Sequence, residues 1–161
     1  NMCFFHHHRV NICIMALFVY KTYQELSKDE LYHILKIRAS VFIVEQNCVY
    51  QDIDDMDQDA LHLWMIEEGK IVSYARVLKA NTYLDEVAIG RVISLERNKG
   101  YGKAIFAQAL EIAQNKFQAE IVKIRAQQQV EHFYNQFNFQ RCGQPFMYEG
   151  LMHVDMIWKK Q

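Results

Sequence analysis

Residues 86–103 read EVAIGRVISLERNKGYGK, which predicts a strand, a turn containing glycine, and the start of a helix. Gly100 and Gly102 allow the backbone to approach a ligand closely, because glycine carries no side chain. The free N–H groups and the positive dipole end of the new helix form an anion site. One arginine and two lysines within 97–103 add local positive charge. The stretch therefore indicates binding of a phosphate or pyrophosphate group.

Two familiar nucleotide-binding motifs do not fit this stretch. The P-loop pattern GxxxxGK[ST] fails because Lys103 is followed by Ala104, and no glycine stands five residues before Gly102. The dinucleotide-binding pattern GxGxxG fails because the third glycine is absent. On this stretch alone, a tight turn that starts a helix without any ligand is an equally good interpretation.

The rest of the chain alternates between predicted strands and helices. Ser27 is expected to cap a helix, in which residues at helical spacing from Leu31 to Glu45 share one face. Glu68-Gly69 is expected to join two strands as a hairpin. Strands are expected at 16–23, 61–66, 71–78, 86–95, 120–126, 139–142 and 152–158, and further helices at 103–117 and 130–137. This order predicts a mixed α/β sheet.

The composition limits the class of protein. The chain has 161 residues, of which 51% are hydrophobic and 23% charged, and this suits one domain with its own core. We expect residues 1–14 to be a tail or a start-site artefact, and residues 15–161 to form the domain. The net charge of −1 provides no general attraction for nucleic acid or an anionic membrane.

Neither a metal site nor a membrane helix is expected. The cysteines at 3, 13, 48 and 142 form no CxxC pair and no spaced cluster with histidine, so reduced thiols are expected. The longest apolar run, 12–20, is far shorter than the roughly 20 residues of a membrane helix, and we expect a cytoplasmic protein. The acidic loop at 47–59 fails as an EF-hand, because Ala60 stands where glycine is needed and Ile66 where glutamate is needed. We expect this loop either to be solvated or to line an acceptor site.

Several motifs together carry a family resemblance. Arg97-x-x-Gly100-x-Gly102, after an apolar strand, resembles the R/Q-x-x-G-x-G/A motif of the GCN5-related N-acetyltransferases. The stretch 133–139 (FYNQFNF) is similar to the FYxxxGF of that family, with Asn138 in place of its glycine. Further stretches at 41–48, 50–54, 74–76, 89–92 and 150–156 resemble the ElaA branch. The similarity covers residues 16–158, although the segment between Val92 and Arg97 is shorter than is usual.

The resemblance implies a fold and an acyl donor. The family fold is a mixed, mostly antiparallel twisted sheet with flanking helices and a splayed central strand pair, which admits the pantetheine arm of acetyl-CoA. The pyrophosphate would lie on the turn, and strand backbone would pair with the pantetheine amides as an added strand does. The residues implied for the cofactor are Val92, Ile93, Ser94, Arg97, Asn98, Lys99, Gly100, Tyr101, Gly102, Lys103 and Gln127.

The resemblance also implies a mechanism in which a substrate amine attacks the thioester directly. Tyr134 matches the tyrosine that protonates the departing thiolate, although its spacing with Val130, Phe133 and Phe137 equally suits a core residue. The base stays open among Glu45, Glu86, His62, His153 and a water held by one of them, with His153 and Glu45 preferred. An ion pair with Arg38, Arg76 or Arg91 is an equally good interpretation of Glu45. The residues expected to bind the substrate are His62, Arg76 and Arg91, and pairing of both arginines with the acidic loop is the alternative.

These observations predict an acetyl-CoA-dependent N-acetyltransferase that acts on a primary amine in a ternary complex. The alternative is a non-catalytic acyl-CoA-binding or regulatory domain with the same fold. We expect a small-molecule or peptide amine as partner, with no nucleic acid, membrane or metal, and a homodimer stays open.

Overall fold

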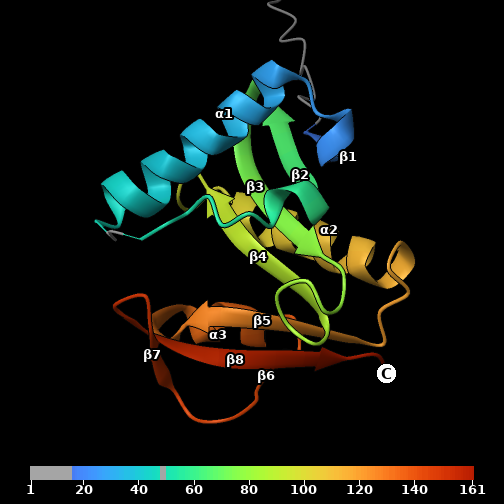
Figure 1. Cartoon of the computed structure of the whole chain (residues 1–161), viewed down its shortest axis with the longest axis vertical. Helices are drawn as coiled ribbons and strands as arrows, with labels where there is room; N and C mark the ends of the chain where they lie inside the picture. Colours follow the sequence, from blue (N-terminus) through green and yellow to red (C-terminus); the bar gives the residue numbers. More distant parts are fainter. Residues whose placement is uncertain (1–15, 48–49) are drawn as a thin grey trace, which may run out of the picture.

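The computed structural model describes residues 16–47 and 50–161, which form one sheet with helices on both faces (Figure 1). The tail predicted at 1–14 lies outside the described residues, as do three of the four cysteines. The sheet has eight strands in the order β1-β2-β3-β4-β5-β8-β6, and β7 also pairs with β8. All pairs of neighbouring strands are antiparallel except β4 with β5. The predicted mixed and mostly antiparallel sheet is therefore confirmed.

The elements have the following bounds. The strands are β1 (Leu17–Thr22), β2 (Ala60–Glu67), β3 (Lys70–Leu78), β4 (Val87–Ser94), β5 (Ile121–Gln127), β6 (Gln140–Arg141), β7 (Phe146–Tyr148) and β8 (Leu151–Lys159). The α-helices are α1 (Lys28–Arg38), α2 (Tyr101–Asn115) and α3 (Glu131–Asn135). Shorter helical segments are η1 (Tyr23–Glu25), the π-helical η2 (Ala39–Glu45), η3 (Asp57–Asp59) and η4 (Gln128–Val130).

The order of the elements follows the sequence prediction, with one change and one addition. The helix expected to continue to Glu45 ends as α1 at Arg38, and η2 follows it with wider turns. The N–H of Gln46 accordingly donates to the carbonyl of Val41, five residues earlier. The addition is β7, which was not predicted because a strand of three residues beside Pro145 leaves no readable alternation.

Helices α1 and α2 cover opposite faces of the sheet. Neighbouring side chains of a strand point to opposite faces, so Leu63 packs in the core beneath α2 and Trp64 in the core beneath α1. The α1 core draws its sheet residues from β1 to β4 and contains no described residue of β5 or β8. The α1 face of β5 and β8 is therefore left open for a site.

The parallel neighbours β4 and β5 separate soon after they meet. Their register contains two pairs, Val87 with Val122 and Ala88 with Lys123. Beyond these pairs, the carboxyl-terminal parts of the two strands diverge (Figure 1). The splayed strand pair that the sequence resemblance implies is thereby confirmed.

A bulge in β4 accompanies this separation. Arg76 of β3 faces Gly90, whereas Tyr74 of β3 faces Ile93, so β4 contains one extra residue between these pairs. Within the bulge, Arg91 has a φ of 53°, in the left-handed region that residues other than glycine seldom adopt. A bulge of this kind bends its strand and directs β4 away from β5.

The acidic loop is held against the sheet by a group of ion pairs, here called the arginine–aspartate cluster. Asp52 and Asp57 are each only 4% exposed, so the expectation of a solvated loop is wrong for them. The charges balance, with three arginines facing three aspartates. The members of the cluster are Arg38, Arg76, Arg91, Asp52, Asp54 and Asp57.

Each aspartate of the cluster contacts two arginines. Arg38 Nε donates to Asp52 at 2.9 Å, and Arg38 Nη1 donates to Asp57 at 2.6 Å. Arg76 donates both terminal nitrogens to Asp54, at 2.6 and 2.7 Å, and Nη1 also to Asp57 at 2.8 Å. Such short, charge-assisted bonds offset the cost of burying the charged groups.

Among residues 16–47 and 50–161, no group of three His, Cys, Asp or Glu side chains is arranged to hold a metal ion. Within the same ranges, no helix has the length and apolar character needed to span a membrane.

The substitution Arg38→Met tests whether the cluster holds the loop. It removes a fully buried cation and leaves Asp52 and Asp57 short of a partner, which should lower the free energy of unfolding by about 3–5 kcal/mol. The matched control is Arg141→Met, because Arg141 pairs with Glu131 at the surface and should contribute at most about 1 kcal/mol. Urea unfolding of both variants gives the comparison, and equal losses would contradict the role of the cluster.

The cluster also predicts how stability depends on pH. Burial raises the pKa of Asp54 and of Asp57, but the arginines beside them lower it by more, so both lie below the ordinary 3.8. The unfolded chain then binds protons more readily than the folded chain. We expect this contribution to be complete above the ordinary pKa and to be lost as the pH falls below 3.8. Urea unfolding at several pH values measures it, and an unchanged slope in Asp57→Asn would contradict it.

Candidate functional site

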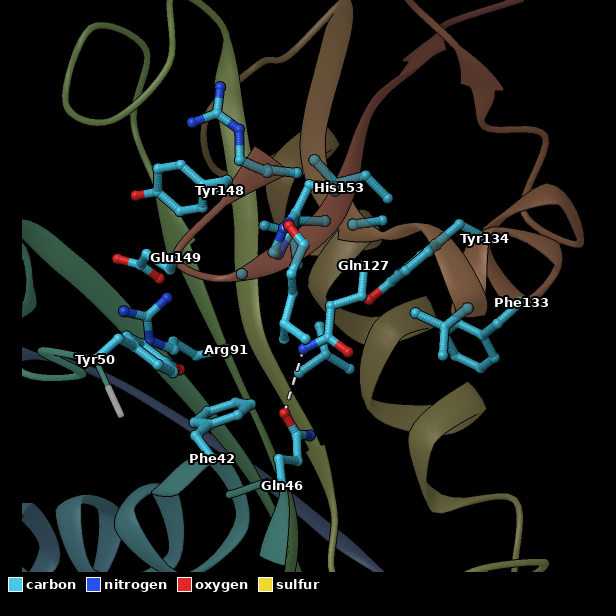
Figure 2. A pocket seen from close by; sticks show the side chains of 18 of the residues that line it. Phe42, Gln46, Tyr50, Arg91, Gln127, Phe133, Tyr134, Tyr148, Glu149 and His153 are labelled. Atoms are coloured by element: carbon cyan, nitrogen blue, oxygen red, sulfur yellow. Dashed lines mark hydrogen bonds between the residues drawn. The ribbon is translucent and has the colours of Figure 1, made fainter. Parts of the chain in front are cut away.

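A cavity of about 440 Å³ lies where β4 and β5 separate (Figure 2). Its lining comes from β4, β5, β8, the end of η2, η4, α3, and β7 with the turn that follows it, and also includes Tyr50 and Tyr83 from loops. Both faces of β5 contribute, because Ile124 and Ala126 point to the α2 face while Arg125 and Gln127 point to the other face. The cavity therefore reaches both faces of the sheet through the gap between the strands.

The turn predicted to bind phosphate has the backbone that an anion site requires. Gly100 caps α2 with a φ of 78°, and it has no side chain to bond the first N–H groups of the helix. Asn98 is also left-handed, with a φ of 62°. The first N–H groups of α2, from Tyr101 to Lys103, are thereby left to an anion. The strand, turn and helix predicted from 86–103 are confirmed, while phosphate binding stays a prediction.

Several side chains of this turn already have carboxylate partners. Arg97 pairs with Glu45 of η2, and Lys99 lies 3.4 Å from Glu96. These pairs are exposed, so a phosphate group can compete for the cations at little cost. In this turn the backbone N–H groups are fixed in position, whereas the charged side chains can exchange their carboxylate partners for a phosphate.

The β4 edge and Gln127 flank the cavity as the cofactor prediction requires. Val92 and Ser94 line it, and neither pairs with β5. Ile93 points into the α1 core and is only 1% exposed, so its backbone alone can contact a ligand. Gln127 donates from Nε2 to Oε1 of Gln46 at 3.2 Å, which links β5 to the end of η2 (Figure 2).

Tyr134 combines the two roles between which the sequence left the choice open. Its ring packs at 4.9 Å from the ring of Phe106 and 5.0 Å from that of Phe133, as the apolar stripe predicts. It also lines the cavity, and no described residue forms a hydrogen bond with its hydroxyl. Burial raises the pKa of Tyr134 to about 12, so the hydroxyl keeps its proton at neutral pH. The hydroxyl therefore reaches the cavity with a proton that it can donate in a hydrogen bond.

His153 lies in the cavity lining, on β8 opposite Gln127. Its Nδ1 is 3.0 Å from the carbonyl oxygen of Leu151, and a carbonyl can only accept, so Nδ1 carries the hydrogen. The neutral ring then keeps a lone pair on Nε2 that can take a proton. His153 therefore remains a candidate base.

Glu45, Glu86 and His62 lie outside the cavity lining, as do Arg76, Ile93 and the turn at 97–103. Glu45 is half exposed and pairs with Arg97, outside the lining, so its role as a base stays a prediction; Glu86 is absent from the lining as well. His62 is fully buried, with Nδ1 at 2.8 Å from the Tyr74 hydroxyl and Nε2 at 3.0 Å from the Asp57 carbonyl. Its two ring nitrogens are thus used inside the protein, so the predicted contact with substrate is wrong.

The arginines divide between the two roles considered for them. Arg76 is 2% exposed and belongs wholly to the arginine–aspartate cluster, so the expected contact with substrate is wrong and the alternative is confirmed. Arg91 belongs to the cluster and also lines the cavity, where its guanidinium lies over the rings of Phe42 and Tyr50 at 5.9 and 5.7 Å. It stays a candidate for binding substrate.

Sequence reasoning missed a second group of lining residues. These are Tyr50, Tyr83, Arg125, Tyr148 and Glu149, which lie around the α1 side of the cavity. A partial signal was present for Arg125, because it and Gln127 alternate with the apolar Ile124 and Ala126 on a strand expected to border the gap. The tyrosines and Glu149 lie in loops, a turn and the unpredicted β7, which leave no periodic signal.

Arg125 is fixed in the cavity wall from several directions. It donates Nε to Asp155 at 2.9 Å, and its guanidinium lies over the rings of Tyr83, Phe146 and Tyr148 at 5.4, 4.9 and 4.9 Å. The ion pair and these cation–π contacts restrict the side chain to one position. Arg125 is therefore built into the cavity wall.

Comparison with known proteins agrees with this geometry. Residues 20–160 match the acetyltransferase (GNAT) domain. Protein ElaA of Escherichia coli is 36% identical over 138 residues, which are 83% of this chain and 90% of ElaA. A UPF0039 protein of Schizosaccharomyces pombe is 35% identical over 143 residues, which are 86% of this chain and 94% of the relative.

Solved structures extend the likeness to three dimensions. The crystal structure of an acyl-CoA N-acyltransferase from Pseudomonas aeruginosa has a TM-score of 0.82 at 29% identity. That of E. coli ElaA has a TM-score of 0.81 at 35% identity, and each comparison covers 89% of this chain and 99% of the other. With its splayed strands, its glycine turn and a match over nearly the whole described chain, this protein belongs to the GNAT acetyltransferase family.

Proposed function

We propose that the protein is an acetyl-CoA-dependent N-acetyltransferase that acts on a primary amine of a small molecule or peptide. The observation that carries the proposal is the cavity between β4 and β5, which reaches both faces of the sheet and contains the Tyr134 side chain. Nothing in the chemistry of the site calls for a metal ion, nucleic acid or membrane as partner.

The residues present fit an acyl-CoA. The β4 edge beyond Ala88 has backbone groups that do not pair with β5 and can bond the pantetheine amides instead. The N-terminus of α2 presents N–H groups for the pyrophosphate. These two features follow one another along the chain, so a single extended ligand can use both.

The proposed chemistry needs one proton acceptor and one proton donor. The nitrogen of the neutral amine attacks the carbonyl carbon of the thioester, and the carbon–sulfur bond breaks as the amide forms. Nε2 of His153, directly or through a water molecule, would take the proton that the amine loses. The Tyr134 hydroxyl would give its proton to the departing sulfur.

Thiol release from acetyl-CoA in the presence of a panel of primary amines tests the function, beside calorimetric titration of acetyl-CoA. Release that depends on an amine supports the proposal. Binding without release from any amine would favour a non-catalytic acyl-CoA-binding domain, and a lack of binding would contradict both functions.

The substitution Gly102→Asp tests the phosphate turn. It places a negative charge on the first turn of α2, where the pyrophosphate would lie, and a repulsion of only about 1.4 kcal/mol weakens binding tenfold. We expect the affinity for acetyl-CoA to fall at least about tenfold, with little change in melting temperature. Gly102→Ala is the matched control, because its Cβ would meet Ser94 Cβ at an ordinary 3.6 Å. Unchanged calorimetric affinity in Gly102→Asp would exclude this placement.

The substitution Tyr134→Phe tests the proton donor. It keeps the ring in the aromatic core and removes only the hydroxyl, so the protein should remain as stable as before. We expect kcat to fall at least about tenfold while the Kd of acetyl-CoA stays nearly constant, because a general acid acts in the transition state. Steady-state rates and thermal melting on one preparation give both readings. Full activity in an assay limited by chemistry would show that another group protonates the sulfur.

A further inference from the structure

The α1 side of the cavity contains a carboxylate, that of Glu149, which forms no ion pair with the cations of residues 16–47 and 50–161. Among the described residues of the lining, Glu149 is the one acid, and it forms no ion pair or hydrogen bond with any described residue. The two arginines of the lining are each neutralised, since Arg91 pairs with Asp52 and Asp54, and Arg125 with Asp155. The charge of Glu149 is therefore left for a ligand to balance.

The position of Glu149 is set by the backbone. Tyr148 pairs with Leu151, so Glu149 and Gly150 form the two-residue turn between β7 and β8. Both have positive φ, 49° and 80°, as the tight turns of hairpins require. The turn holds Glu149 at the cavity rim, on the side of Tyr50 and Arg91 (Figure 2).

Glu149 lies far from the proposed proton donor. In Figure 2, Tyr134 lies at one end of the pocket and Glu149 at the other, with Gln127 and His153 between them. The two ends also belong to different faces of the sheet, because Tyr134 packs in the α2 core. If the reacting amine of an acceptor lies beside Tyr134, the opposite end of the same acceptor lies beside Glu149.

We propose that Glu149 binds a second cationic group of the acceptor, so that the preferred substrates are diamines, or other amines with a second positive charge. This inference rests on the proposed function. An acceptor with a carboxylate at that position would meet the uncompensated negative charge of Glu149. Glu149 is exposed at the rim of the cavity, beside Tyr50 and Tyr148, so water and salt screen part of the attraction.

Three primary amines with the same five-carbon chain serve as probes: 1,5-diaminopentane, pentylamine and 5-aminopentanoate. They differ in the group at the far end, which is cationic, apolar or anionic. With the native protein at saturating acetyl-CoA, we expect kcat/KM for the diamine to exceed that for pentylamine about fivefold, and 5-aminopentanoate to be the poorest. Raised ionic strength should reduce the difference. Equal rates for the diamine and pentylamine, or a preference for 5-aminopentanoate, would overturn the proposal.

Variants of Glu149 assign the preference to this residue. Glu149→Gln should lower the ratio of kcat/KM for the diamine to that for pentylamine to about one, whereas Glu149→Lys should make 5-aminopentanoate a better substrate than the diamine. The matched control is Glu68→Gln, because Glu68 occupies the same position in the Glu68-Gly69 turn between β2 and β3, outside the cavity lining. The control should keep the native order of the three amines. An equal loss of kcat/KM for all three amines in Glu149→Gln would show that Glu149 does not contact the group at the far end of the acceptor.

A binding measurement separates this inference from the proposed function. Calorimetric titration of the protein with 1,5-diaminopentane needs no acyl transfer. Binding that is lost in Glu149→Gln and kept in Glu68→Gln supports the acceptor site even if no amine is acetylated. Absence of diamine binding to a protein that does acetylate pentylamine would overturn the inference and leave the proposed function standing.

Discussion

The left-handed backbone of Arg91 is the constraint on which the cavity depends. It lies in the bulge where β4 contains its extra residue, and beyond this point β4 no longer follows β5. A residue other than glycine adopts this conformation at a cost of about 1–2 kcal/mol. The contacts of its side chain offset that cost, because the guanidinium donates to Asp52 and Asp54 at 2.7 and 3.0 Å. The residue that bends the strand is thus also an anchor for the loop beside it.

The arginine–aspartate cluster connects Arg91 to three other segments of the fold. Its arginines come from α1, β3 and β4, and its aspartates from the acidic loop, so four segments distant in sequence meet in one charge-balanced group. The loop that it holds contains Tyr50, and α1 continues into η2, which contains Phe42. Both residues line the cavity. A group with no direct contact to a reacting atom therefore determines the shape of one cavity wall.

The sequence predicted the parts of the site that are made of backbone. The turn at 97–103 depends on a left-handed Gly100 and a helix that begins without a side-chain cap, and both requirements restrict the residue type. Asn138, which replaces the glycine of the family motif, indeed has a φ of 63°. In contrast, the sequence does not show which cation meets which anion. His62 and Arg76 have the chemistry of substrate-binding residues, but the strand period places them on the face where Tyr74 and the aspartates occupy them.

The same distinction separates the two ends of the cavity. At the end proposed for the acyl donor, the free edge of β4 and the N-terminus of α2 supply backbone groups, whose positions depend little on neighbouring side chains. At the end proposed for the acceptor, the lining also includes side chains from a loop, a turn and a strand of three residues. Substitutions there alter charge and shape without disturbing the sheet. If the proposed function holds, the selectivity of this protein for its acceptor is to be sought in Tyr50, Tyr148 and Glu149.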